Sequence, residues 1–114
     1  MSNVDDGFVR TASLAEIPDG ELRAYDLTVG RVTIAHLENE VFAFGDECTH
    51  EGCSLAEGEL DEMADTVVCP CHGSAFDVRN GEPVKGPAED PLPVYPVRVT
   101  DDGWIELRPV SGEA

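Results

Sequence analysis

The octet CPCHGSAF, residues 69–76, decides how this chain of 114 residues is interpreted. It places two thiols and an imidazole, Cys69, Cys71 and His72, within four consecutive positions. Thiolates and imidazoles are the side chains that bind iron, copper and zinc most readily. Because the whole chain has only 4 cysteines and 3 histidines, this concentration predicts a metal site. It also raises the question of whether the two thiols have the same role.

A second stretch, CTHEGC at residues 48–53, has the same character. It contains a Cys-x-His pair, Cys48 and His50, where the octet contains the Cys-x-x-His pair Cys69 and His72. If the two loops face each other, two thiolates and two imidazoles converge on one site. Two further cysteines, one in each stretch, are then left without a ligand role.

The sequence around these motifs predicts an all-β fold. Short runs of alternating or β-branched residues are separated by turn signals at Val29-Gly30, at residues 38–40, at Asn80-Gly81 and at residues 101–103. Ser13, with Glu16 three positions later, has capping-box spacing and predicts one short helical turn. We expect a single domain over residues 1–114. Its basal β part covers about 1–44 and 78–114, and an irregular insertion of about 45–77 holds every cysteine.

These motifs and their flanks resemble a Rieske iron–sulfur protein. The similarity includes VFAFGDECTH (41–50) and FDVRNGEPVKGPAEDPLPVYPVRV (76–99), and it covers roughly residues 8–108. It implies a Rieske-like antiparallel β-sandwich or barrel with a small inserted cluster-binding subdomain. It also implies one 2Fe–2S cluster per chain, with one iron bound by Cys48 and Cys69 and the other by His50 and His72.

The same resemblance gives the two remaining cysteines a role. In respiratory Rieske proteins, cysteines placed like Cys53 and Cys71 form a disulfide that ties the ligand loops together, whereas many soluble Rieske ferredoxins lack them. The alternative is two reduced, packed thiols, since the cytoplasm expected for this chain keeps most thiols reduced. We expect the disulfide, because a bridge between ordered loops can have a potential too low for glutathione to reduce.

Five further residues are expected to lie around the cluster, and Ser74, Phe76 and the loop that holds Pro87 match positions in that family. The Ser74 hydroxyl is expected to donate a hydrogen bond to a bridging sulfide, whereas Phe76 replaces a tyrosine donor of high-potential members. One donor kept and one lost predicts a potential of roughly 0 to +200 mV, within the family range. Pro87 lies in the loop GPAEDPLP, which we expect to cover the cluster rather than to be a plain surface connection. Gly52 and Gly73 are expected to let backbone amides approach the cluster sulfurs, although they are nearly as typical of ordinary turns.

The resemblance implies a soluble one-electron carrier, not itself an enzyme, that passes electrons between a reductase and an oxygenase or another redox partner. Ring hydroxylation by the chain alone is excluded, because a mononuclear iron site needs further histidines and only His36 is left. We expect His36 to be a structural residue. Two alternatives are a non-catalytic Rieske small subunit of a larger complex, similar to that of nitrite reductase, and a structural zinc module.

The charge of the chain is strongly negative. With 24 acidic and 7 basic residues, its formal net charge is −17 at pH 7, which disfavours binding to nucleic acid or to anionic membranes. Either a high-salt habitat or steering toward a basic partner would explain this acidity. The sequence shows no signal peptide and no apolar run long enough for a membrane anchor, so we expect a cytoplasmic monomer.

Overall fold

The computed structural model describes residues 7–49, 52–71 and 73–108. Almost all regular structure in these ranges is β-strand. The strands are β1 (Val9–Ser13), β2 (Leu22–Leu27), β3 (Gly30–Leu37), β4 (Glu40–Gly45), β5 (Glu59–Asp61), β6 (Thr66–Val68), β7 (Ala75–Asp77), β8 (Pro83–Lys85), β9 (Val94–Tyr95), β10 (Val97–Val99) and β11 (Trp104–Leu107). Two single-turn 3₁₀ helices, η1 (Leu14–Glu16) and η2 (Leu55–Glu57), complete the elements.

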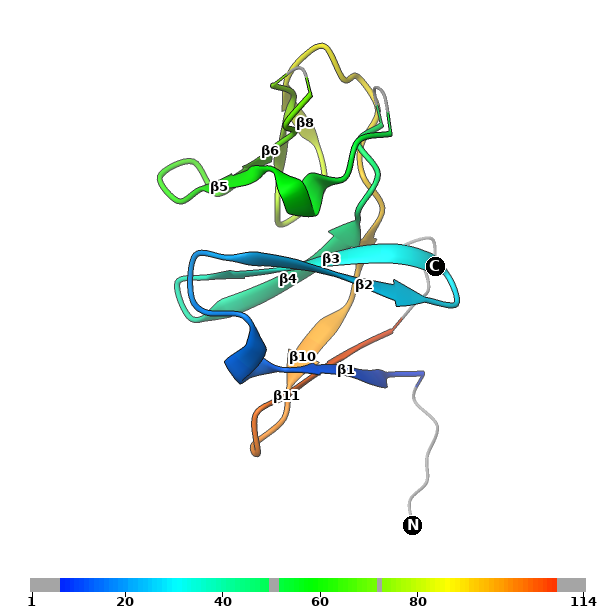
Figure 1. Cartoon of the computed structure of the whole chain (residues 1–114), viewed down its shortest axis with the longest axis vertical. Helices are drawn as coiled ribbons and strands as arrows, with labels where there is room; N and C mark the ends of the chain where they lie inside the picture. The colour runs from blue at the N-terminus through cyan, green and yellow to red at the C-terminus, as the bar shows by residue number, and fades with distance from the viewer. Residues whose placement is uncertain (1–6, 50–51, 72, 109–114) are drawn as a thin grey trace.

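The strands form three antiparallel sheets. Their orders are β1-β11-β10, β2-β3-β4-β9 and β5-β6-β7-β8. Figure 1 shows them as three tiers along the longest axis of the molecule, with the β5–β8 sheet at the top and the β1-β11-β10 sheet at the base. The all-β fold expected from the sequence is therefore confirmed.

Strand β3 lies at the centre of this arrangement and separates two hydrophobic cores. Side chains of a strand alternate between its two faces. Val32 and Ile34 accordingly pack into the core shared with the basal sheet, while Ala35 and Leu37 pack into the core shared with the upper sheet. This burial on both faces explains why the strand reads as a nearly continuous apolar run.

The upper sheet is inserted between two adjacent strands of the middle sheet. Strand β4 pairs with β9, and the N–H of Gly45 donates to the carbonyl of Pro93 at 2.9 Å. The chain thus leaves the middle sheet at residue 45 and returns to it at residue 93. The Asn80-Gly81 turn closes the β7–β8 hairpin within the upper sheet, so this sheet includes residues that follow the expected insertion of about 45–77.

Individual elements agree with the sequence predictions in some places and differ from them in others. The predicted capping box is present, with Ser13 Oγ accepting the N–H of Ala15 and the Ser13 N–H donating to Glu16 Oε2. Strand β5 was not expected, because it is short and acidic, with only Leu60 between two exposed carboxylates. No helix in the described ranges is long and apolar enough to cross a bilayer.

Candidate metal centre

The first candidate ligand loop, residues 48–53, follows directly from β4 and is held at its start by Asp46. This carboxylate is buried; its Oδ1 accepts the Thr33 hydroxyl at 2.6 Å and the N–H of Ala56 at 2.9 Å. The main-chain N–H of Asp46 donates to the carbonyl of Arg31 at 3.0 Å, and its carbonyl accepts the N–H of Leu55 at 2.8 Å. Asp46 therefore connects the middle sheet, η2 and the first loop. No sequence motif marks this residue, although it lies two residues before Cys48.

The second candidate loop, residues 69–74, repeats the backbone hydrogen bonds of the first. In the first loop the N–H of Cys48 donates to Cys53 O at 2.9 Å, and in the second the N–H of Cys69 donates to Ser74 O at 2.8 Å. Each loop thus closes between its first and sixth residues. The two cysteines, Cys48 and Cys69, consequently occupy equivalent positions at the starts of two similar turns.

The fifth residue of each loop is a glycine in the left-handed region. Gly52 and Gly73 both have φ of 79°, a conformation that side chains with a Cβ disfavour. Their N–H groups donate to the carbonyls of Cys48 and Cys69, at 2.8 and 3.1 Å. The N–H groups of the two glycines therefore complete the turns, and the approach of backbone amides to cluster sulfurs stays a prediction.

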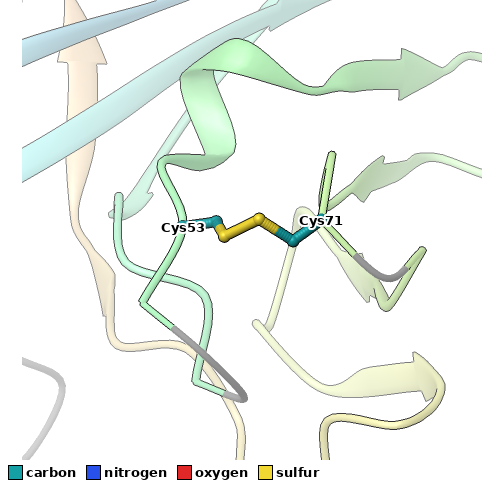
Figure 2. Close-up of a disulfide and its surroundings, with 2 residues drawn as sticks. All are labelled: Cys53 and Cys71. Atoms are coloured by element: carbon teal, nitrogen blue, oxygen red, sulfur yellow. A yellow bond between two sulfur atoms is a disulfide. The ribbon is translucent and has the colours of Figure 1, made fainter.

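The four cysteines divide into two pairs. Cys53 and Cys71 form a disulfide with a Cα–Cα distance of 6.5 Å, which is the pairing that the resemblance implied. Figure 2 shows this bond joining the segment before η2 to the turn after β6. Cys48 and Cys69 take no part in it; each is 3% exposed, and both belong to the upper core. Two buried thiols on facing loops suit an iron–sulfur cluster, whose thiolate ligands are shielded from water.

The proline-bearing segment, residues 86–93, contacts both loops. The N–H of Ala88, which is buried, donates to Ser74 Oγ at 3.0 Å. The Thr49 hydroxyl donates to the carbonyl of Asp90 at 2.7 Å. Pro87 itself lies exposed on this segment. A loop bonded to both ligand loops fits the expected cover over the site better than a plain surface connection does.

Ser74 and Phe76, the two residues expected to tune the cluster, are both fully buried. Because Ser74 Oγ accepts the Ala88 N–H, its own O–H proton is not used in that bond and can point elsewhere. Phe76 packs in the same core as Cys48 and Cys69 and has no polar atom to offer. The burial of both side chains is compatible with the roles that the resemblance implied.

Of the three histidines, one lies within the described residues. His50 and His72, the expected imidazole ligands, lie outside the described residues. His36 lies on β3, where its Nδ1 is 2.6 Å from the Ile17 carbonyl and its Nε2 is 3.9 Å from Asp19. The expectation that His36 is structural is therefore confirmed.

The surroundings of the loops are negatively charged. Between Arg31 and Arg79 the sequence contains no lysine or arginine, and this stretch includes both candidate loops and the β5–β6 hairpin. The Arg31 guanidinium is 3.7 Å from Asp46 at the entrance to the first loop. Negative charge around a metal centre opposes the addition of an electron.

Comparison with known proteins identifies the family. The Rieske [2Fe-2S] domain model matches residues 7–96. This chain belongs to the Rieske [2Fe-2S] domain family. It is 40% identical, over 78% of its length and 83% of the relative's, to the 3-phenylpropionate/cinnamic acid dioxygenase ferredoxin subunit of Photorhabdus laumondii.

Solved structures of Rieske proteins are similar over most of the chain. The ferredoxin of carbazole 1,9a-dioxygenase from Nocardioides aromaticivorans has a TM-score of 0.87 and 28% identity, covering 92% of this chain and 100% of its own. A chain in the complex of reduced oxygenase and oxidized ferredoxin in carbazole 1,9a-dioxygenase has a TM-score of 0.86 and 26% identity. That match covers 96% of this chain and 100% of the other.

Membership of this family settles the nature of the centre. The chain carries a Rieske-type 2Fe–2S cluster and transfers electrons, and it is not itself catalytic. The structural zinc module considered from the sequence is therefore wrong. Iron bound partly by imidazole in place of thiolate has a less negative ligand set, which raises the potential relative to all-cysteine clusters.

Proposed function

We propose that this Rieske protein carries single electrons from a reductase to an oxygenase. Support comes from the relative named as a dioxygenase ferredoxin subunit and from the similarity to a chain in an oxygenase–ferredoxin complex. The observation that carries the proposal is the pair of equivalent turns, each of which begins with a buried thiol, Cys48 in one and Cys69 in the other. The small-subunit alternative is less favoured, because all four candidate ligands are present in the sequence.

Within that proposal, Cys48 and Cys69 bind one iron, and His50 and His72 bind the other. When bound, the cluster would supply one-electron transfer, and this chain would supply its ligands, its hydrogen bonds and its shielding from water. The Ser74 hydroxyl donates toward a cluster sulfur and stabilises the reduced, more negative state.

The ligand assignment is tested by iron and acid-labile sulfide analysis of anaerobically purified variants. Cys48→Ser, Cys69→Ser, His50→Ala and His72→Ala should each lose the cluster and its reduced-state EPR signal, whose average g lies below the free-electron value. His36→Gln is the matched control and should keep both. Wild-type protein that contains no iron and cannot be reconstituted would end the proposal.

The partners are tested by pull-down with the reduced protein, followed by rapid mixing under anaerobic conditions. The expected result is capture of an oxygenase and a flavin or NAD(P)H reductase, with one-electron oxidation of the reduced chain by the former and reduction of the oxidised chain by the latter. A chain that exchanges electrons with neither class would count against the oxygenase role.

The reduction potential is expected to depend on the number of side-chain hydroxyls that donate hydrogen bonds to the sulfur atoms of the centre, which is one in this chain and two in high-potential members. With Ser74 present and Phe76 lacking a hydroxyl, we propose a midpoint of roughly 0 to +200 mV. Protein-film voltammetry measures it directly. A value near −150 mV, about the bottom of the family range, would mean that the Ser74 hydroxyl does not stabilise the reduced cluster.

We also propose that the carrier acts as a monomer. Its exposed large hydrophobic side chains, within the described ranges, are distributed over separate elements rather than gathered on one. Single exposed apolar residues are normal for a monomer surface. Light scattering coupled to size-exclusion chromatography tests this, and a mass twice that of one chain would contradict it.

A further inference from the structure

Three sulfur atoms of the two candidate ligand loops lie close together. The Sγ atoms of Cys53, Cys69 and Cys71 are all within 4.8 Å of one another. Two of them already share a disulfide, so the group is not a set of three metal ligands. The third belongs to Cys69, a candidate iron ligand outside the disulfide. The thiol of a candidate iron ligand therefore lies within 4.8 Å of both sulfurs of a disulfide that it could attack.

We propose that these three sulfurs form a thiol–disulfide exchange site that acts when the cluster is lost; this rests on the proposed ligand role of Cys69. Iron holds a ligand cysteine as a thiolate, and the thiolate is the form that attacks disulfides. The Cys69 sulfur attacks Cys53 Sγ, a Cys53–Cys69 bond forms, and the Cys53–Cys71 bond breaks. The electron pair of the broken Cys53–Cys71 bond stays on Cys71 Sγ, which then takes a proton from water. One disulfide replaces another, so no oxidant is required.

Burial indicates which sulfur leaves. Cys71 is exposed, Cys53 is half-buried and Cys69 is 3% exposed. A thiolate is most stable where water solvates it, so exchange that moves the charge from buried Cys69 to exposed Cys71 is favourable. The other outcome, a Cys69–Cys71 bond, would have to close across Pro70, whose fixed φ limits the backbone adjustment that disulfide geometry requires.

Exchange would have a consequence for the cluster-free chain. With Cys69 in a disulfide, one iron ligand is blocked, because a metal requires the thiolate. The chain would then reload a cluster only after an external thiol had reduced the new bond. It would also carry one exposed thiol, on Cys71, that the loaded protein lacks.

The test maps thiols and disulfides before and after cluster removal. Loaded protein is stripped with an iron chelator in the absence of any thiol, alkylated under native conditions, digested without reduction and analysed by mass spectrometry. We expect loss of the Cys53–Cys71 peptide, appearance of a Cys53–Cys69 peptide and alkylation of Cys71. An intact Cys53–Cys71 bond with Cys69 alkylated would overturn the proposal. Disulfides that include Cys48 would also overturn it, because they indicate exchange in an unfolded chain.

Two matched variants separate exchange from cluster loss itself. Cys48→Ser and Cys69→Ser each remove one candidate thiolate ligand, so both should purify without a cluster. Only Cys48→Ser keeps the attacking sulfur, so only it should show alkylated Cys71. Equal alkylation of Cys71 in the two variants would refute the role of Cys69, and circular dichroism verifies that both are folded.

Iron and sulfide analysis of the starting protein keeps the two proposals distinguishable. If wild-type protein never holds iron, the carrier assignment fails, whatever the disulfide map shows. If it holds iron and the Cys53–Cys71 bond survives stripping, only the exchange proposal fails.

Discussion

The two candidate ligand loops have the same internal hydrogen bonds but different supports. The loop at residues 48–53 emerges from the middle sheet and is fixed by buried Asp46, whereas the loop at residues 69–74 lies within the β6–β7 hairpin of the upper sheet. The turns themselves are local, since each closes between its own cysteine and the residue five positions later. Their relative placement is not local: it depends on the disulfide, on Asp46 and on the proline-bearing segment.

The largest effect should come from removing the disulfide, which acts on both loops. Cys53→Ser combined with Cys71→Ser releases a link between residues 18 apart. We expect the free energy of unfolding to fall by about 3 kcal/mol, the chain-entropy value for a loop of this size. Chemical denaturation of the loaded proteins measures it. A fall below about 1 kcal/mol would show that the other two supports already fix the loops.

The next largest effect should be confined to the first loop. Asp46→Ala leaves the buried Thr33 hydroxyl and the partly buried Ala56 N–H without their acceptor, which should cost about 2–3 kcal/mol. Asp46→Asn retains an oxygen acceptor and should cost about half as much. Thermal and chemical unfolding, together with iron content, distinguish these variants. Equal losses in the two would show that the charge, rather than the hydrogen bonds, matters.

A smaller contrast compares the two bonds to the proline-bearing segment. Ser74→Ala leaves the buried Ala88 N–H unpaired and should cost about 1–2 kcal/mol. Thr49→Val removes a more exposed bond to Asp90 and should cost about 0.5 kcal/mol. Only Ser74→Ala should also lower the reduction potential, because it removes a donor to the reduced cluster. Equal potentials in the two variants would contradict the donor role of Ser74.

Phe76→Tyr should change the potential with little change in stability. The side chain lies in the core that includes Cys48 and Cys69, and an added hydroxyl that reaches a cysteine sulfur would stabilise the reduced state. We expect the midpoint to rise, as measured by voltammetry. An unchanged midpoint would indicate that the hydroxyl does not reach a sulfur.

The smallest expected effect is a pH dependence of stability caused by Tyr25 on β2, and it should leave both candidate ligand loops unchanged. Burial, together with the hydrogen bond to Glu16, raises the pKa of Tyr25 to about 12. The unfolded chain then loses this proton first, near pH 10, so stability should fall as pH rises from about 10 to 12. Because the side chain is partly exposed, we expect at most about 1 kcal/mol. Unfolding of wild type and Tyr25→Phe across this range isolates the effect, and parallel pH profiles would contradict it.

Much of this molecule could be predicted from its sequence, because the deciding signals are local. Turn signals at Val29-Gly30 and Asn80-Gly81 mark real strand connections, and the Ser13–Glu16 spacing gives a real capping box. The pairing of Cys53 with Cys71 followed from the resemblance to the family. The high-salt explanation of the acidity stays a prediction.

What the sequence did not reveal depends on contacts between distant residues. Asp46 lies two residues before a motif that was recognised and Thr49 lies within it, yet their roles arise from Thr33 and Asp90, which lie 13 and 41 positions away. Nothing near residue 77 indicates that the chain will pair once more in the upper sheet before Pro93 meets Gly45.

The hydrogen bond between Gly45 and Pro93 also makes the upper tier a portable unit. Its two ends emerge side by side from neighbouring antiparallel strands, which is how the ends of an ordinary hairpin turn are placed. Replacement of residues 46–92 by a tight turn should leave the lower two tiers continuous, and the excised piece could be spliced into the hairpin of an unrelated sheet protein. Electron-carrying capacity could thereby be transplanted into a host whose sheet supplies a hydroxyl in the place of Thr33 and an apolar face in the place of Ala35 and Leu37.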